Sequence, residues 1–154
     1  MIDQAVNDKI RIVLATLHAV EQRDIRGLLD LYHRDVEFHD APSLPYGGVV
    51  RGKTAVEAHT YSTNGWAATW GPLQPTNAER RMDPHVVAAN EDEVVVLYRQ
   101  RAVAPSGERF DAPVLALYKV RDGKLIRAQM FHFDTVAVVG FLARANGATV
   151  ESSE

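Results

Sequence analysis

The sequence predicts an α+β fold in which helices come first and a mostly antiparallel sheet follows. Residues 3–21 carry apolar side chains at helical spacing, and Asp3 is placed to cap that helix. Residues 93–134 are rich in β-branched and aromatic residues, so we expect continuous sheet there. Within this stretch, Arg121-Asp122-Gly123-Lys124 predicts a tight hairpin turn, because Asp and Gly tolerate left-handed backbone conformations.

The segment between these two regions predicts shorter elements. Residues 24–32 predict a second helix that begins with an aspartate, and residues 36–40 alternate as in a short strand. Residues 41–48 contain prolines and glycines and should form a loop. Residues 53–70 predict a third helix, and Asn64-Gly65 within it favours a break into two parts.

The remaining segments complete the expected domain. Residues 78–88 predict a less regular strand, and Pro84 favours an edge position for it. Residues 135–145 return to helical spacing, and Asn146-Gly147 is expected to end that helix. We therefore expect one domain over residues 1–147 and a disordered tail over residues 148–154.

Composition excludes several classes of function. The chain has 154 residues, of which 46% are hydrophobic and 24% charged, as in an ordinary globular domain. A formal net charge of -3 argues against nucleic acid as a partner. No apolar run is long enough for a membrane span and no signal-peptide pattern follows Met1, so we expect a cytoplasmic protein. The chain has no cysteine, which excludes thiolate catalysis.

Separate parts of the chain resemble a known family. They are residues 27–38, residues 46–56, and the last hairpin and strand at residues 122–126 and 132–134. Together with the order of the elements, they resemble the SnoaL-like polyketide cyclase branch of the nuclear transport factor 2-like superfamily, which also contains ketosteroid isomerases. The resemblance implies a cone-shaped domain, in which a curved, mostly antiparallel sheet wraps around the N-terminal helices and encloses an apolar pocket.

The resemblance leaves different functions open, because the superfamily contains both enzymes and binding proteins. We expect a cofactor-free acid–base enzyme of the cyclase or isomerase type, acting on a small hydrophobic ketone or polyketide-like substrate. The alternatives are a non-catalytic module that binds an apolar small molecule, and an epoxide hydrolase or dehydratase. No cofactor and no metal are expected, since the chain has no phosphate-binding glycine loop and no HExxH pattern. A metal site built from His39, His132 and nearby aspartates is the remaining alternative.

Asp40, His132 and Asp134 are the candidate catalytic residues. Asp40 follows the first strand, where the chain resembles the region that holds the general base of ketosteroid isomerases, and a carboxylate beside an apolar cavity becomes a stronger base. His132 and Asp134 share a strand face and resemble the acidic last strand of the cyclases, which implies Asp134 as base and His132 as donor to an enolate. Alternatively, Asp134 caps the final helix and Asp40 caps the adjoining loop.

Other residues are expected to bind the substrate. Tyr46 and Tyr98 offer phenol donors in place of the first-helix tyrosine of the isomerases, which residues 3–21 lack. Asp111 lies near the position of the second aspartate of the isomerases. Arg99 shares a strand face with Arg101 and resembles the arginine that holds the acid–base pair of the epoxide hydrolases. Surface positions are the favoured alternative for Asp111 and both arginines.

Apolar residues are expected both inside and outside the cone. Trp66, Trp70 and Met130 are predicted to line the pocket, where they suit a flat or aromatic ligand. The outer sheet face should also be apolar, and we expect it to form a homodimer. The residues expected on that face are Val95, Leu97, Leu115, Leu117, Phe131 and Phe133.

Overall fold

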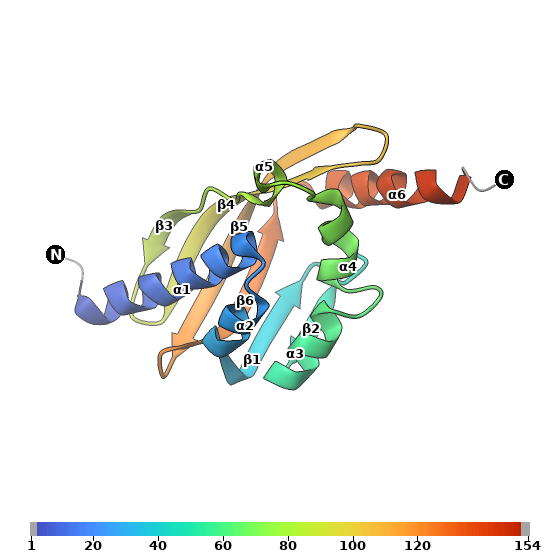
Figure 1. The fold of residues 1–154 in the computed structure, drawn as a ribbon. Helices are drawn as coiled ribbons and strands as arrows, with labels where there is room; N and C mark the ends of the chain where they lie inside the picture. The colour runs from blue at the N-terminus through green and yellow to red at the C-terminus, as the bar shows by residue number, and fades with distance from the viewer. Residues whose placement is uncertain (1–2, 152–154) are drawn as a thin grey trace.

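The computed structural model describes residues 3–151 and shows an α+β fold, as the sequence predicts (Figure 1). The helices are α1 (Gln4–Gln22), α2 (Ile25–Leu31), α3 (Lys53–Thr60), α4 (Trp66–Trp70), α5 (Asn77–Arg80) and α6 (Thr135–Glu151), with a 3-10 turn η1 (Gly71–Leu73). The strands are β1 (Tyr32–Asp40), β2 (Gly48–Arg51), β3 (His85–Ala89), β4 (Glu93–Val103), β5 (Arg109–Arg121) and β6 (Lys124–His132). The long first helix begins at Asp3, whose carboxylate accepts a hydrogen bond from the Ala5 N–H.

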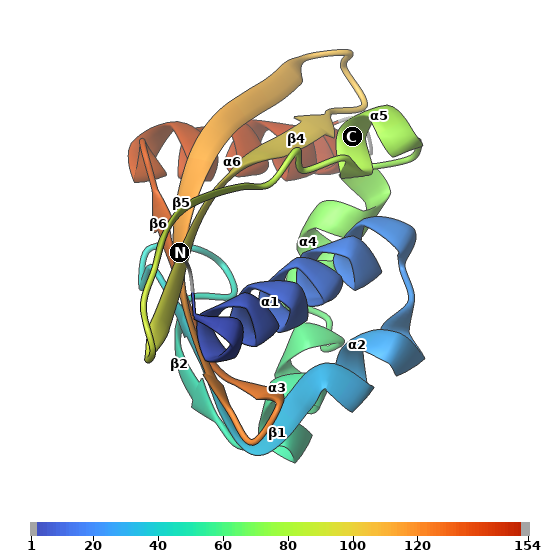
Figure 2. The ribbon, with the colours of Figure 1, turned by 90° about the vertical axis from the view of Figure 1, so that its left-hand side faces the viewer.

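The strands form one mixed sheet. Its order is β2-β1-β6-β5-β4-β3, and all neighbouring pairs are antiparallel except β1 with β6. The sheet curves, and α1 to α4 lie on its concave side (Figure 2). The parallel pairing brings the end of β1 beside the end of β6, although these segments are far apart in the sequence.

Alternation along the strands decides which residues face the helices. In β5, Val114, Ala116 and Tyr118 are buried on the concave side, whereas Leu115 points to the convex side and is 40% exposed. Asp122 has a positive φ of 54° at the turn between β5 and β6. The hairpin that the sequence predicts at this turn is therefore confirmed.

The buried side chains form separate apolar clusters at the two ends of the domain. The larger cluster joins α1 to the concave face of the sheet and includes Val13, Val96 and Leu125. The other cluster surrounds Trp70 and Phe141, and it packs α6 against α4 and the distal part of β4 and β5. This arrangement leaves room between the clusters for a cavity.

The structure differs from the sequence prediction in some local elements. The predicted third helix is divided into α3 and α4, with Gly65 at the start of α4, as Asn64-Gly65 indicates. Residues 77–80 form the short helix α5 rather than the start of a strand, because the Thr76 hydroxyl caps it. The short strand β2 falls where the sequence predicts a loop and a helix entry.

The final helix is longer than predicted. It continues past Asn146-Gly147 to Glu151, so the expected stop at that pair is wrong. Asn and Gly inside a helix cost only about 0.5–1 kcal/mol each relative to Ala, which is too little to end one by itself. Residues 152–154 of the predicted tail lie outside the described residues. Within residues 3–151, none of the helices combines the length and the apolar character that crossing a membrane requires.

Candidate functional site

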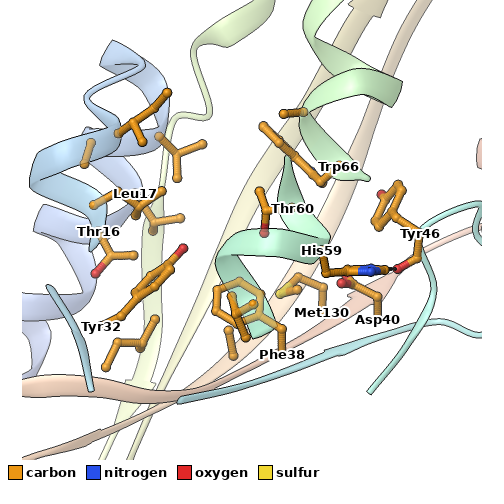
Figure 3. Close-up of a pocket in the computed structure, with 18 of the residues that line it drawn as sticks. Thr16, Leu17, Tyr32, Phe38, Asp40, Tyr46, His59, Thr60, Trp66 and Met130 are labelled. Atoms are coloured by element: carbon orange, nitrogen blue, oxygen red, sulfur yellow. Dashed lines mark hydrogen bonds between the residues drawn. The ribbon is translucent and has the colours of Figure 1, made fainter. Parts of the chain in front are cut away.

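A cavity of about 260 Å³ lies between the concave face of the sheet and helices α1 to α4 (Figure 3). Its wall is mostly apolar, and Leu17, Phe38, Val56 and Met130 are typical contributors. A cavity of this kind, with a small number of polar groups on its wall, is the usual form of a small-molecule site.

Asp40 places a carboxylate on this wall. It is the last residue of β1 and shares the concave face with Phe38, two positions earlier. Burial raises the pKa of Asp40 to about 6, and the charge of His59 only partly opposes that rise. The Asp40 side chain accepts no hydrogen bond from any residue in the described part of the chain. A carboxylate in this state is available to take a proton from a ligand near neutral pH.

His59 on α3 lies next to Asp40 and is held by Tyr46 (Figure 3). Its Nε2 lies 2.9 Å from the backbone carbonyl oxygen of Tyr46. Because a carbonyl oxygen only accepts, Nε2 of His59 carries a proton and donates it to this hydrogen bond. The Tyr46 hydroxyl oxygen accepts from Nε1 of Trp70 at 2.9 Å, which leaves the hydroxyl hydrogen of Tyr46 for a ligand.

Tyrosines surround Asp40 on the sheet. The register between β1 and β6 places Asp40 beside Met130, and Met130 pairs with the small residue Ala116 on β5. Tyr118 follows Ala116 by two positions on β5, and Tyr98 on β4 pairs with Val114, two positions before Ala116. Both tyrosines therefore share the concave face with Ala116, and both line the cavity. The hydroxyl groups of Tyr98 and Tyr118 have no hydrogen-bond partner among residues 3–151, although both side chains are buried. They are therefore donors that a bound ligand would satisfy.

His132, at the end of β6, adds a neutral imidazole to the same wall. It pairs with Val114 on β5, which in turn pairs with Tyr98 on β4. The Cα atoms of His132 and Tyr98 are therefore two strand spacings, roughly 10 Å, apart across the sheet. Burial lowers the pKa of His132, which keeps its ring neutral at pH 7. The prediction that His132 lies on the apolar face together with Met130 is confirmed.

The structure separates the other predicted site residues from the cavity wall. Asp134 is exposed and accepts a hydrogen bond from the Ala137 N–H at 3.0 Å, so it caps α6. Arg99 and Asp111 pair on the convex face, where Nε of Arg99 lies 2.8 Å from the Asp111 carboxylate. Trp70 is fully buried behind Tyr46 and reaches the site only through the Tyr46 hydroxyl.

The predicted residues that the structure does bring together are Asp40, Tyr46, Trp66, Tyr98, Met130 and His132. Sequence reasoning assigned no site role to His59, and it missed Arg23, Tyr32 and Gln100, all of which line the cavity. Gln100 lies two positions after Tyr98, so strand alternation would have found it. No local signal marks Arg23, which follows the end of α1.

The alternative metal site does not form. His39 lies on the convex face, where its Nε2 is 3.1 Å from the Glu37 carboxylate, whereas His132 lines the cavity on the concave face. Across the described residues 3–151, no group of histidine and acidic side chains is placed to hold a metal ion.

Comparison with known proteins identifies the fold and the family. The model of the SnoaL-like domain family matches residues 13–128. No protein of curated function matches the sequence significantly. Among solved structures, TerC co-crystallised with polyporic acid is 24% identical, with a TM-score of 0.69, and the alignment covers 88% of this chain and 98% of TerC.

Bacterial structures of the same fold show similar agreement. An NTF2-like protein of unknown function from Burkholderia pseudomallei K96243 is 18% identical with a TM-score of 0.72, over 88% of this chain and 97% of that one. A candidate SnoaL-like polyketide cyclase from Jannaschia sp. CCS1 is 19% identical with a TM-score of 0.69, over 94% and 95% of the two chains. The predicted nuclear transport factor 2-like fold is thus confirmed. Because the family match spans most of the chain, this protein belongs to the SnoaL-like domain family.

Proposed function

We propose that the protein is a cofactor-free acid–base enzyme of the cyclase or isomerase type, which enolises a small hydrophobic ketone or polyketide-like substrate in the cavity. One observation carries this proposal. The Asp40 carboxylate faces the cavity without any hydrogen-bond donor from residues 3–151, and burial raises its pKa to about 6. A base with a pKa near the working pH is the group that this chemistry requires.

In the proposed reaction, Asp40 removes a proton from the carbon next to the substrate carbonyl. The electron pair of that C–H bond becomes the enolate C=C bond, and the negative charge develops on the former carbonyl oxygen. Tyr98 and His132, which rise from one row of the sheet, supply the hydrogen-bond donors for this oxygen. In cyclisation, the enolate carbon attacks a second carbonyl of the substrate, and the alkoxide that forms takes the proton from Asp40. In isomerisation, the substrate is a β,γ-unsaturated ketone, and its dienolate takes that proton back at the γ-carbon.

The geometry also bears on the alternatives. A non-catalytic binding module predicts that backbone N–H groups occupy both Asp40 and Asp134, but only Asp134 is occupied in this way within residues 3–151. An epoxide hydrolase in which Arg99 or Arg101 holds the acid–base pair is not favoured, because both arginines pair with Asp111. A dehydratase that uses a histidine and an aspartate is our second candidate, because His59 lies beside Asp40 on the cavity wall.

The partner of this site is proposed to be a small hydrophobic molecule. The cavity volume of about 260 Å³ and its apolar wall support this, and TerC, a relative of the same fold, was crystallised with polyporic acid. We also propose that two copies of the chain associate through the convex face. Leu97, Leu115 and Phe131 are direct cross-strand neighbours there, and their exposed fractions are 38%, 40% and 50%.

Hydrogen–deuterium exchange tests the proposed chemistry. The protein is incubated in D2O with hydrophobic ketones such as 2-tetralone, and NMR follows deuterium entering beside the carbonyl. The wild type is expected to accelerate exchange, and Asp40→Asn should lower the rate by about 100-fold or more. Asp111→Asn removes a carboxylate outside the cavity and should leave the rate unchanged. Equal rates for the wild type and Asp40→Asn would contradict the role of Asp40.

A further inference from the structure

A guanidinium group without a counter-ion borders the cavity. Arg23 follows α1 in a left-handed backbone conformation with φ of 57°. Its Nη1 donates to the Val20 carbonyl oxygen at 3.1 Å, its Nη2 donates to Oε1 of Gln74, and its Cζ lies 5.5 Å from the centre of the Trp66 ring. All these partners are neutral, and no carboxylate of residues 3–147, whose side chains the structure describes, lies at ion-pair distance from Arg23. Several of its N–H donors therefore remain for a ligand.

Arg80 increases the positive charge beside Arg23. Its Nε donates to the Gln74 carbonyl oxygen at 2.9 Å and its Nη2 donates to the Pro75 carbonyl oxygen at 3.5 Å, so its partners are neutral too. Burial, followed by the charge of Arg80, lowers the pKa of Arg23. The two cations thus sit together, and neither forms an ion pair with a carboxylate that the structure describes.

The acidic side chains that border this region are engaged elsewhere. The Asp24 carboxylate accepts a hydrogen bond from the Gly27 N–H at 3.0 Å and caps α2. The Glu79 carboxylate bonds to the hydroxyl group of Thr76 at the start of α5. Both carboxylates keep their negative charge, but neither forms an ion pair with Arg23, so N–H groups of Arg23 remain available to a ligand in the cavity.

Gln100 provides a second, independent observation that points to a ligand-binding role for this region. It is only 6% exposed, and its Nε2 has no hydrogen-bond partner among residues 3–151. Gln100 and Arg23 both line the main cavity, and both also line a small neighbouring cavity of about 10 Å³. A buried amide donor without a partner is costly, and an acceptor oxygen from a ligand would satisfy it.

Arg23 is also held in place before a ligand arrives. Gln74, which is 4% exposed, accepts from Arg23 and donates its own Nε2 to the Arg101 carbonyl oxygen at 2.8 Å. The indole of Trp66 supports the other side of the guanidinium. A side chain fixed by such contacts loses little freedom when it binds an anion.

We propose that Arg23 and Gln100 bind a carboxylate carried by the ligand, so that the substrates are hydrophobic keto acids rather than neutral ketones. A carboxylate is planar and accepts paired hydrogen bonds from a guanidinium, so it suits the N–H groups of Arg23 that have no partner among residues 3–147. The keto-acid part of this proposal rests on the proposed enolising function, whereas the carboxylate site does not.

The position of this site would also orient the substrate. Arg23 follows α1 and rests on Trp66 of α4, whereas Asp40 ends β1 and lies beside His59 (Figure 3). Arg23 attracts a carboxylate, and the ionised Asp40 repels one. The acid group is therefore held near Arg23, and the ketone is directed toward Asp40.

Equilibrium binding tests the carboxylate site without requiring turnover. Calorimetry at pH 7.5 compares 4-oxo-4-phenylbutanoate and its naphthyl analogue, each with its own primary amide. The wild type should bind each acid at least about tenfold more tightly than the paired amide. Arg23→Gln should bring the ratio close to one, Arg23→Lys should retain part of it, and Gln100→Leu should lower it. Arg26→Gln makes the same charge change at an exposed position outside both cavities and should leave the ratio unchanged.

The outcomes separate this inference from the proposed function. A wild type that binds no acid more tightly than its amide contradicts the carboxylate site, as does a ratio that survives Arg23→Gln in a folded variant. Asp40→Asn should keep the preference for the acid while it abolishes deuterium exchange. If the preference stands but exchange is absent, the proposed chemistry is wrong and the carboxylate site remains. If exchange stands without the preference, only the carboxylate site is wrong.

Discussion

Nε1 of Trp70 donates a hydrogen bond of 2.9 Å to the hydroxyl oxygen of Tyr46. The two side chains are 0% and 3% exposed, so neither group has water as a substitute partner. The bond joins the apolar cluster around Phe141 to the cavity wall, because Trp70 stacks on Phe141 while Tyr46 lines the cavity. It therefore contributes both to stability and to the position of a phenol donor.

Tyr46→Phe should destabilise the protein although it removes only one oxygen atom. The change leaves the buried Nε1–H of Trp70 without an acceptor, which costs about 1–3 kcal/mol of unfolding free energy. Urea denaturation of Tyr46→Phe, Trp70→Phe and the double variant measures the coupling. The double variant should lose less stability than the sum of the single losses. Additive losses would show that the hydrogen bond contributes nothing.

Asp40→Asn should stabilise the protein at alkaline pH while it removes activity. The pKa of Asp40 in the folded protein, about 6, is above the ordinary value of 3.8. Its carboxyl group therefore contributes most stability below about pH 4, where it is protonated, and this contribution is lost as the pH rises through about 6. Asn cannot ionise, so its stability relative to the wild type should grow by roughly 3 kcal/mol between pH 4 and pH 8. Melting temperatures from pH 4 to pH 8 check this, and an advantage that does not grow with pH would contradict it.

Deuterium exchange should follow the ionisation of the same carboxyl group. Because only the carboxylate can accept a proton, the wild-type rate should rise between pH 5 and pH 7 with a midpoint near the Asp40 pKa of about 6. The measurement is the initial NMR rate at constant ionic strength. A midpoint near pH 4 would mean that Asp40 is not shielded from water in the way that the cavity suggests.

Asp134→Ala should affect stability but not chemistry. Its carboxylate accepts from the Ala137 N–H at 3.0 Å and lies outside the cavity wall, so the expected loss is that of a helix cap, about 1 kcal/mol. Asp134→Asn keeps a capping oxygen and should recover most of this loss. Thermal denaturation together with the exchange assay checks both statements, and a large fall in exchange rate would restore the catalytic role expected from the sequence.

Phe131→Lys should convert the proposed dimer to a monomer. Phe131 is 50% exposed and pairs with Leu115 in the convex apolar row, so a charge there would be buried on association. Leu14→Lys is the matched control, at a residue of α1 that is 36% exposed. It should leave the molecular mass of the particle in solution at that of the dimer. Sedimentation equilibrium gives the masses, and a wild type that is already monomeric would contradict the proposal.

Local patterns determine a large part of this protein. Alternation places Met130 and His132 on one face, and Asp122-Gly123 marks the hairpin between the last two strands, because both features depend only on neighbouring residues. The same rule explains why Tyr98 lines the cavity while the adjacent Arg99 pairs with Asp111 on the other face. A shift of one residue in the alignment to the isomerases reverses the face of every side chain, so resemblance alone does not decide whether Asp111 faces the cavity.

The combination of distant groups into a site depends on how the elements pack together. The parallel pairing of β1 with β6 sets Asp40 beside Met130, and the packing of α3 brings His59 next to both. Arg23 lies near Gln100 because Gln74 joins the end of α1 to the last part of β4, through hydrogen bonds to Arg23 and to the Arg101 carbonyl oxygen. The strands of the last hairpin and the faces of their side chains follow from short-range periodicity, so they can be predicted from the sequence. The site depends on contacts between segments far apart in the chain, and no short-range pattern encodes those contacts.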